Sequence, residues 1–220
     1  ALNLINDNST VLDIGCNNGK LGELIIKKKK CKVYGIDEIN KKNDRLNFFY
    51  PSNLNDDLPE LNYNELDYVI FLDVIEHLND PENFMLKLYE KLSHNEKVKV
   101  IISTPNISFF IIRFMLLFGS FNYGKRGILD KTHTRLFTFS SFKKLIENSN
   151  FEIEKSIGIP APFPLAIGEN FMGNLLLKIN NFLIFLWKSF FSYQILNIIK
   201  PKKSLDLLLQ KAEDEAKKIS

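Results

Sequence analysis

The chain has 220 residues, of which 45% are hydrophobic, so it can bury one sizeable core but not two, and we expect a single domain over residues 1–220. Basic residues outnumber acidic ones by only 29 to 26 and are spread along the chain, which argues against a DNA-binding surface. Cys16 and Cys31 fit neither a disulfide framework nor a metal ribbon, which indicates a reducing compartment, the cytoplasm.

In the first half of the chain, short apolar runs alternate with a helix-like segment. Strands are predicted at residues 11–14, 32–36, 47–50 and 67–72, and a helix at residues 20–30. The run 67–72 is almost wholly apolar, as expected for a strand that is buried on both faces at the centre of a parallel sheet.

The second half continues this alternation. Asp80 and Pro81 are typical of a helix N-terminus. The helix that they begin carries one apolar stripe, formed by Phe84, Met85, Leu88 and Leu92. Further strands are predicted at residues 97–103, 151–159 and 193–199, and further helices from Thr138 or Ser140 to about residue 148 and at residues 205–219. Alternating strands and helices predict an open α/β sheet.

Two stretches, residues 106–127 and 160–192, interrupt the alternation and are predicted to be apolar helical insertions. Neither holds the run of about eighteen apolar residues that a helix needs to cross a bilayer. In the second, a narrow polar stripe divides a mostly apolar helix surface. Two interpretations stay open: the insertions pack on the sheet and on each other, or they form a lid or a membrane-interface surface.

Residues 11–19 (VLDIGCNNG) join a strand to a helix through a glycine-rich turn, which is typical of a nucleotide-binding site. A dinucleotide fingerprint starting at Gly15 requires glycines where this chain has Asn17 and Lys20. A P-loop requires four residues between its glycines, whereas Gly15 and Gly19 enclose three. The spacing therefore argues against both of these nucleotide-binding motifs.

The turn instead resembles motif I of class I S-adenosylmethionine (SAM)-dependent methyltransferases, in which an acidic residue precedes three glycines at alternate positions. Here the motif is Asp13, Gly15, Asn17 and Gly19, and the asparagine in place of the middle glycine tolerates the left-handed backbone conformation well. Residues 72–78 (LDVIEHL) extend the resemblance to the ubiquinone-type and related methyltransferases of types 11, 12 and 23.

That resemblance covers about residues 10–160. It implies a Rossmann-like α/β fold: a seven-stranded, mostly parallel sheet with helices on both faces and SAM across the carboxyl ends of the first strands. The family usually carries one or two helices before its first strand. Because this chain begins almost on that strand, we expect those helices to be missing from it.

The resemblance also implies which residues contact the cofactor. Asp37 ends the second strand, where a carboxylate accepts hydrogen bonds from both ribose hydroxyls. Asn53 takes the place of an acid that meets the adenine amino group, a role that Asp56 or Asp57 could fill instead. The predicted cofactor contacts are Asp13, Gly15, Cys16, Asn17, Gly19, Asp37, Glu38, Asn53, Leu54, Asp73 and Val74.

Methyl transfer needs no covalent residue, but a hydroxyl acceptor benefits from a general base, and histidine titrates near neutral pH. Of the three histidines, His94 lies in a polar turn and is predicted to be exposed. His77 and His133 are predicted to be catalytic and to reach one cleft, with His133 as the base or the substrate anchor.

Four residues allow an alternative chemistry. Asp73, Glu76, His77 and His133 resemble the metal-binding set of the small-RNA 3′-terminal 2′-O-methyltransferases. Such carboxylate and imidazole ligands suit Mg²⁺, Mn²⁺ or Zn²⁺. The pattern Asp-x-x-Glu-His also recurs in methyltransferases with no known metal, so a divalent ion is the alternative and not the first interpretation.

Residues 123–138 resemble a subgroup of methyltransferases that is often fused to, or encoded beside, glycosyltransferases. This implies O-methylation of a sugar hydroxyl in a glycan or glycolipid precursor and association with a glycosyltransferase. If the apolar insertions form a membrane-interface surface, we expect peripheral contact with the inner face of the membrane. Tyr123, Arg126 and Arg135 are the predicted acceptor contacts, with the arginines suited to phosphate or carboxylate. Two alternatives stay open: a quinone- or lipid-type small-molecule methyltransferase, and a catalytically weak SAM-binding module.

Overall fold

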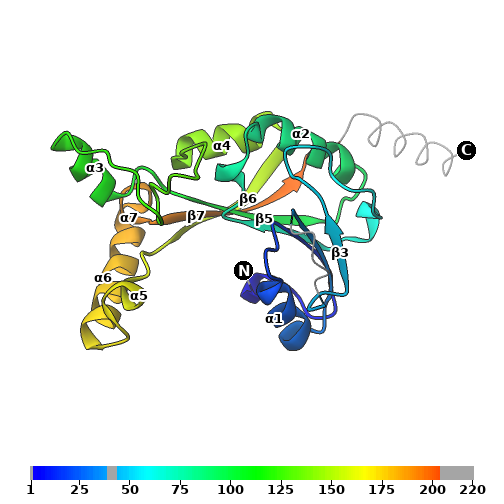
Figure 1. The fold of residues 1–220 in the computed structure, drawn as a ribbon, viewed down its shortest axis with the longest axis horizontal. Helices are drawn as coiled ribbons and strands as arrows, with labels where there is room; N and C mark the ends of the chain where they lie inside the picture. Colours follow the sequence, from blue (N-terminus) through cyan, green and yellow to red (C-terminus); the bar gives the residue numbers. More distant parts are fainter. Residues whose placement is uncertain (1, 39–43, 204–220) are drawn as a thin grey trace, which may run out of the picture.

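The computed structural model describes residues 2–38 and 44–203, which form one sheet with helices against its faces (Figure 1). In chain order the elements are η1 (Leu2–Leu4), β1 (Thr10–Ile14), α1 (Lys20–Lys29), β2 (Lys32–Asp37), β3 (Phe48–Pro51), η2 (Tyr63–Glu65), β4 (Tyr68–Leu72), η3 (Ile75–His77), α2 (Pro81–Leu92), β5 (Lys99–Pro105), α3 (Phe110–Leu117), α4 (Phe139–Asn148), β6 (Phe151–Ile159), α5 (Phe163–Ile167), α6 (Phe171–Leu186), α7 (Lys188–Phe191) and β7 (Gln194–Pro201). The helix predicted at residues 205–219 lies outside the described residues.

The seven strands follow the order β3-β2-β1-β4-β5-β7-β6. The pairs from β3 to β5 are parallel, and β7 runs antiparallel to both β5 and β6. This confirms the predicted open, mostly parallel sheet of seven strands, with strand ends within about two residues of the expected positions. From β1 the sheet is extended on one side by β2 and β3, and on the other side by β4 and β5. The point between β1 and β4 is therefore a topological switch point, where the carboxyl ends of the strands form a binding crevice.

Apolar side chains explain why helices cover both faces of the sheet. On one face, the predicted stripe of α2 is buried together with Phe142 and Ile146 of α4 against Leu12 of β1 and Phe71 of β4. On the other face, Ile25 of α1 packs against alternate residues of the same strands. The period of two along each strand thus divides the core into two layers.

Two helix N-termini that bear on the site are capped by side chains. The Asp80 carboxylate accepts a hydrogen bond from the N–H of Asn83, as predicted for the start of α2. Of the two residues considered for α4, Thr138 is the cap. Its hydroxyl accepts from the N–H of Ser141, and the Ser141 hydroxyl accepts from the N–H of Thr138. These caps determine where the loops between the helices and the sheet begin.

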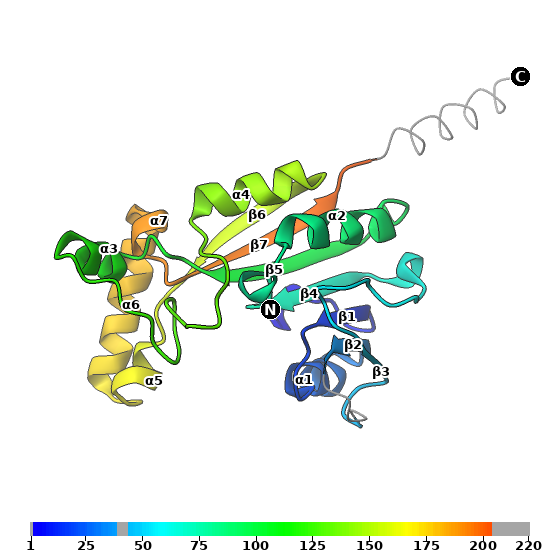
Figure 2. The same cartoon turned by 45° about the horizontal axis from the view of Figure 1, so that its top comes forward.

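The stretches predicted as insertions contain α3 and the three helices α5, α6 and α7, which lie together at one end of the molecule (Figure 2). A small apolar cluster joins the two stretches, with Ile112 of α3 and Ala161 before α5 among its members. Many of their other apolar side chains are exposed, including Phe118 at 81% and Phe185 at 85%. Within the described part of the chain, no helix has both the length and the apolar character required to cross a membrane.

Candidate active site

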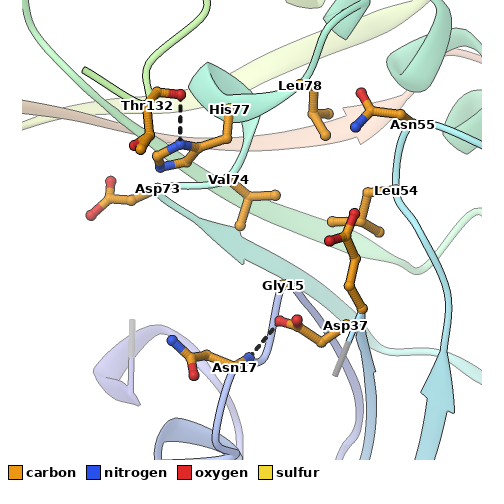
Figure 3. A pocket seen from close by; sticks show the side chains of 11 residues that line it. Gly15, Asn17, Asp37, Leu54, Asn55, Asp73, Val74, His77, Leu78 and Thr132 are labelled. Atoms are coloured by element: carbon orange, nitrogen blue, oxygen red, sulfur yellow. Dashed lines mark hydrogen bonds between the residues drawn. The ribbon is translucent and has the colours of Figure 1, made fainter. Parts of the chain in front are cut away.

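The carboxyl ends of β1, β2 and β4 surround a cavity of about 550 Å³ (Figure 3). Its lining residues are Gly15, Asn17, Asp37, Glu38, Leu54, Asn55, Asp73, Val74, His77, Leu78 and Thr132. Seven of the eleven predicted cofactor contacts are in this set, together with one of the two predicted catalytic histidines. The cavity therefore lies at the switch point of the sheet, where open α/β sheets bind ligands.

Left-handed backbone conformations shape the loop between β1 and α1. Gly15 and Gly19 each have a φ of 70°, and Asn17 between them has a φ of 47°. Asparagine is among the residues that adopt this conformation most readily, which explains how it replaces a glycine here. The N–H of Asn17 donates to Oδ2 of Asp37 at 2.7 Å, so the loop is bonded to the end of β2.

At Gly15 the loop approaches the segment after β4 closely. A Cβ atom at this position would lie 2.5 Å from Cγ2 of Val74, which is too short for two carbon atoms. The absence of a side chain therefore permits both the positive φ and the contact with Val74.

Four predicted cofactor contacts, Asp13, Cys16, Gly19 and Asn53, do not line the cavity. Asp13 is buried beneath the loop, and this burial, with the charge of Asp37, raises its pKa to about 7. Cys16 is also buried, which raises the pKa of its thiol to about 12 and keeps it protonated. Asn53 is engaged within its own loop.

In that loop, the Asn53 side chain accepts from the N–H of Asn55 at 3.0 Å, and the side chain of Asn55 accepts from the N–H of Asn79 at 2.9 Å. This places Asn55, and not Asn53, against the cavity. Sequence reasoning missed Asn55, Leu78 and Thr132 as lining residues. The only signal for Asn55 was its place two residues after Asn53, since an asparagine often bonds to the backbone two residues on.

The two predicted catalytic histidines meet although 56 residues separate them in the chain. Their ring centroids are 4.8 Å apart and the rings are nearly perpendicular, at 71°. Nδ1 of His77 lies 3.1 Å from the carbonyl oxygen of Thr132, and Nδ1 of His133 lies 3.0 Å from that of Ile128. A carbonyl oxygen can only accept, so each Nδ1 carries a proton, and in the neutral form of each ring Nε2 then keeps its lone pair.

Glu76 lies beside this pair and is almost completely buried, at 1% exposure. Its backbone carbonyl accepts from the N–H groups of Thr134 and Arg135, which holds the segment containing His133 against η3. Among the described residues neither carboxyl oxygen has a well-formed hydrogen bond, although the neighbouring Thr104 hydroxyl interacts with the group and favours its charged form. Burial, together with the charge of Asp73, raises the pKa of Glu76 to about 8.

Asp73 has a φ of 57° at the end of β4 and lines the cavity. Its Oδ1 accepts hydrogen bonds from the hydroxyl of Ser103 and from Nε2 of Gln194. Among the described residues, the potential metal ligands that gather are Glu76, His77 and His133, without Asp73. The structure thus brings together three of the four metal candidates and engages the fourth with the neighbouring strands β5 and β7.

The three predicted acceptor contacts lie outside the cavity lining. Tyr123, Arg126 and Arg135 are all exposed, and Arg135 forms an ion pair with Glu82 of α2 at 3.1 Å. Their role in binding an acceptor stays a prediction. The third histidine, His94, is exposed, as predicted.

Residues 1–156 match the sequence pattern of a family described as a methyltransferase domain. This match spans more than half of the chain, so the chain belongs to that family. The protein is a class I SAM-dependent methyltransferase, as its cofactor loop predicted, and its cofactor is SAM. No curated protein matches the chain.

Solved structures share the fold. A SAM-dependent methyltransferase from Archaeoglobus fulgidus superposes with a TM-score of 0.58 at 22% identity, over 88% of this chain and 86% of that one. Another, from Mesorhizobium loti, gives 0.56 at 13%, over 88% and 91%. The 1,6-didemethyltoxoflavin-N1-methyltransferase of Burkholderia thailandensis, with S-adenosylhomocysteine bound, gives 0.55 at 14%, over 90% and 72%.

Proposed function

We propose that this methyltransferase transfers the methyl group of SAM to a sugar hydroxyl in a glycan or glycolipid precursor. The observation that carries the proposal is the histidine pair at the cavity. His77 lines the cavity, His133 adjoins it, and each offers a free Nε2 lone pair. A hydroxyl is the acceptor that benefits most from such groups, because it must lose its proton during the transfer.

SAM would occupy the cavity with its ribose at the end of β2. There the Asp37 carboxylate, bonded to the Asn17 N–H, has capacity for the ribose hydroxyls. Glu38, the next residue in the chain, also lines the cavity, and Leu54 and Asn55, which line it too, would flank the adenine ring. Gly15, which lines the cavity without a side chain, would lie beside the methionine part of the cofactor.

The reaction itself is an in-line displacement. The hydroxyl oxygen forms a bond to the methyl carbon as the carbon–sulfur bond breaks, and the electrons of that bond pass to sulfur to give neutral S-adenosylhomocysteine. The hydroxyl proton leaves at the histidine pair, where His133 acts as the base or as the anchor of the acceptor. The protein therefore contributes alignment, exclusion of water and a site for the acceptor oxygen.

The test has two stages. Calorimetry with SAM and S-adenosylhomocysteine measures cofactor binding: weak binding of both would favour the interpretation as a catalytically weak SAM-binding module, and absence of binding would contradict the proposed function. Methyl transfer from labelled SAM is then measured on sugar hydroxyls and on quinone-type acceptors. We expect His133→Ala to lower turnover on the sugar acceptor at least about 100-fold, in the range of general base catalysis, and His94→Ala to leave it unchanged. Full turnover by His133→Ala contradicts its proposed role.

A specific observation favours a lipid-linked acceptor over a free sugar. Large apolar side chains are exposed together on α3, α5 and α6, at one end of the molecule (Figure 2). The charged residues of segments 107–127 and 160–192 are Arg113, Lys125, Arg126, Lys178 and Lys188 against the single acid Glu169. An apolar surface with a positive balance suits the interface of an anionic membrane. We propose that this surface contacts the inner face of the membrane.

Sedimentation with liposomes tests the membrane contact. We expect the protein to sediment with vesicles that contain anionic lipid, and Phe118→Ser and Phe185→Ser to reduce the bound fraction. Leu86→Ser, which alters an exposed apolar residue of α2, is the matched control and should bind as the unaltered protein does. Equal binding by all variants, or none by the unaltered protein, contradicts the proposal.

A further inference from the structure

We propose that Glu76, His77 and His133 together hold a divalent transition-metal ion, such as Zn²⁺ or Mn²⁺, which receives the acceptor hydroxyl. The inference rests on the proposed function only for the identity of the group that the ion receives. The ligand atoms are one carboxylate oxygen and one imidazole nitrogen from each histidine, and all lie within 4.8 Å of one another.

Both histidines bond to a backbone carbonyl through one ring nitrogen, as metal-binding histidines commonly do. A histidine that binds a metal through one ring nitrogen commonly donates the N–H of the other to a carbonyl or carboxylate, which determines the tautomer and the ring orientation. Here the carbonyl oxygens of Thr132 and Ile128 receive the Nδ1 protons of His77 and His133. Two Nε2 lone pairs at nearly perpendicular rings are therefore available to one ion.

Glu76 is the independent observation that points to a cation. Both of its carboxyl oxygens are buried, and among the described residues they have no well-formed hydrogen bond; the neighbouring Thr104 hydroxyl interacts with the carboxyl group and is itself without a well-formed bond. Buried carboxyl groups in proteins are nearly always bonded or paired with a charge. An ion at the two Nε2 atoms would give this carboxylate a partner of opposite charge, which the Thr104 hydroxyl does not supply.

The dimensions and the ligand types suit a transition metal. Zinc binds nitrogen and oxygen ligands at about 2.0–2.2 Å, so two ligand atoms are at most about 4.4 Å apart, and closing this group requires movements of less than about 1 Å. Imidazole nitrogens favour ions such as Zn²⁺ and the carboxylate also suits Mn²⁺, whereas Mg²⁺ prefers a shell made of oxygen ligands and water. Three protein ligands also leave a coordination position open, and His77 places that position beside the cavity.

An ion bound to both Nε2 atoms would activate the acceptor in place of the histidines, so that His133 would anchor the acceptor through the ion and would not act as the base. A bound divalent ion lowers the pKa of a coordinated oxygen group, as zinc lowers that of water to about 7. The acceptor hydroxyl would bind the ion and release its proton to solvent water. The resulting oxygen anion then forms the bond to the methyl carbon, the electrons of the carbon–sulfur bond pass to sulfur, and the ion is left unchanged.

Metal content of the full chain tests the inference without any acceptor. The protein is dialysed against a chelator, then against Zn²⁺, Mn²⁺ or Mg²⁺, and bound metal is measured by elemental analysis. We expect one Zn²⁺ or Mn²⁺ per chain in the unaltered protein and in His94→Ala. Glu76→Gln and His133→Ala should bind these ions at least about tenfold more weakly.

Glu76→Gln keeps the shape of the protonated carboxyl, and the melting temperatures of the metal-free variants show whether they are folded. Absence of stoichiometric metal, unchanged affinity in Glu76→Gln, or Mg²⁺ binding as tight as Zn²⁺ binding overturns the inference. If the chelated protein still binds SAM and transfers methyl groups at the full rate, the metal inference fails while the proposed function stands. If SAM binds neither to the chelated protein nor to the metal-loaded protein, the proposed function fails.

Discussion

The backbone N–H of Asn17 donates to Oδ2 of Asp37 at 2.7 Å. This bond joins the loop after β1 to the end of β2, its parallel neighbour in the sheet. Because both residues line the cavity, the bond holds one oxygen of the carboxylate in place before any ligand enters. A carboxylate oriented in advance loses little freedom on binding, which strengthens its hydrogen bonds to a ligand.

Asp37→Ala should therefore weaken SAM binding. Hydrogen bonds to a charged group contribute about 1.5–3 kcal/mol, so we expect the Kd for SAM to rise about 10- to 150-fold. Calorimetry measures the change, with Glu90→Ala on the exposed side of α2 as a control that should bind SAM normally. An unchanged Kd in Asp37→Ala would remove the ribose contact from the proposed binding mode.

Gly15→Ala should destabilise the loop and impair cofactor binding. The new side chain would require a φ of 70° and would lie 2.5 Å from Val74, and strain of this kind costs about 1–3 kcal/mol. Thermal unfolding and SAM titration measure the two effects. Gly124→Ala is the matched control, because its Cβ would find its nearest atom at 3.5 Å and its φ is not positive. Normal stability and SAM binding in Gly15→Ala would contradict the loop geometry.

The stability of the metal-free protein should fall as the pH rises. Burial raises the pKa of Asp13 from 3.8 to about 7 and that of Glu76 from 4.5 to about 8. Between these values the folded state holds a proton that the unfolded state has lost, so each group lowers the free energy of unfolding by up to about 1.4 kcal/mol per pH unit. This stabilisation is complete below about pH 4 and is lost as the pH passes 7 to 8.

Glu76→Gln cannot titrate at this position, so its free energy of unfolding should fall less steeply between about pH 5 and 8 than that of the unaltered protein. Denaturant unfolding in the presence of a chelator, at several pH values, gives the two slopes. Glu90→Gln, which alters an exposed acid, should reproduce the slope of the unaltered protein. Identical slopes in Glu76→Gln and the unaltered protein would show that Glu76 is ionised in the folded state.

Asn180→Ala should loosen the helices at the end of the molecule. The buried Asn180 side chain accepts from the N–H of Ala161 and donates to the carbonyl of Phe191, both at 2.9 Å, so it connects α6 with the start of α5 and the end of α7. Leaving the buried N–H of Ala161 unpaired costs about 1–3 kcal/mol, and leaving the partly buried carbonyl of Phe191 unpaired costs less. We expect faster amide hydrogen exchange in α6. Asn181→Ala is the control, because Asn181 is exposed and bonds within its own helix.

The cofactor loop and the alternation of strands and helices were predictable from sequence because both are local. The loop depends on glycines and an asparagine at close spacing, and strands and helices reveal themselves by a periodicity of two or 3.6 residues. For the same reason, the predicted element ends differ from the structure by only one or two residues.

Which side chains meet in the site was decided by the tertiary structure. The bonds between the Glu76 carbonyl and the segment after His133 bring the two histidines together, and no periodicity in the sequence reports a contact between segments so far apart. Asn55 lines the cavity in place of Asn53 because the Asn53 side chain accepts the N–H of Asn55 within their loop. The Asp73 carboxylate accepts from the Ser103 hydroxyl because β5 lies beside β4. By itself, the sequence determined the fold and the cofactor, since local patterns encode both. Only the packing of the sheet decided which polar groups remain free for an acceptor or an ion, since that depends on which loops become neighbours in space.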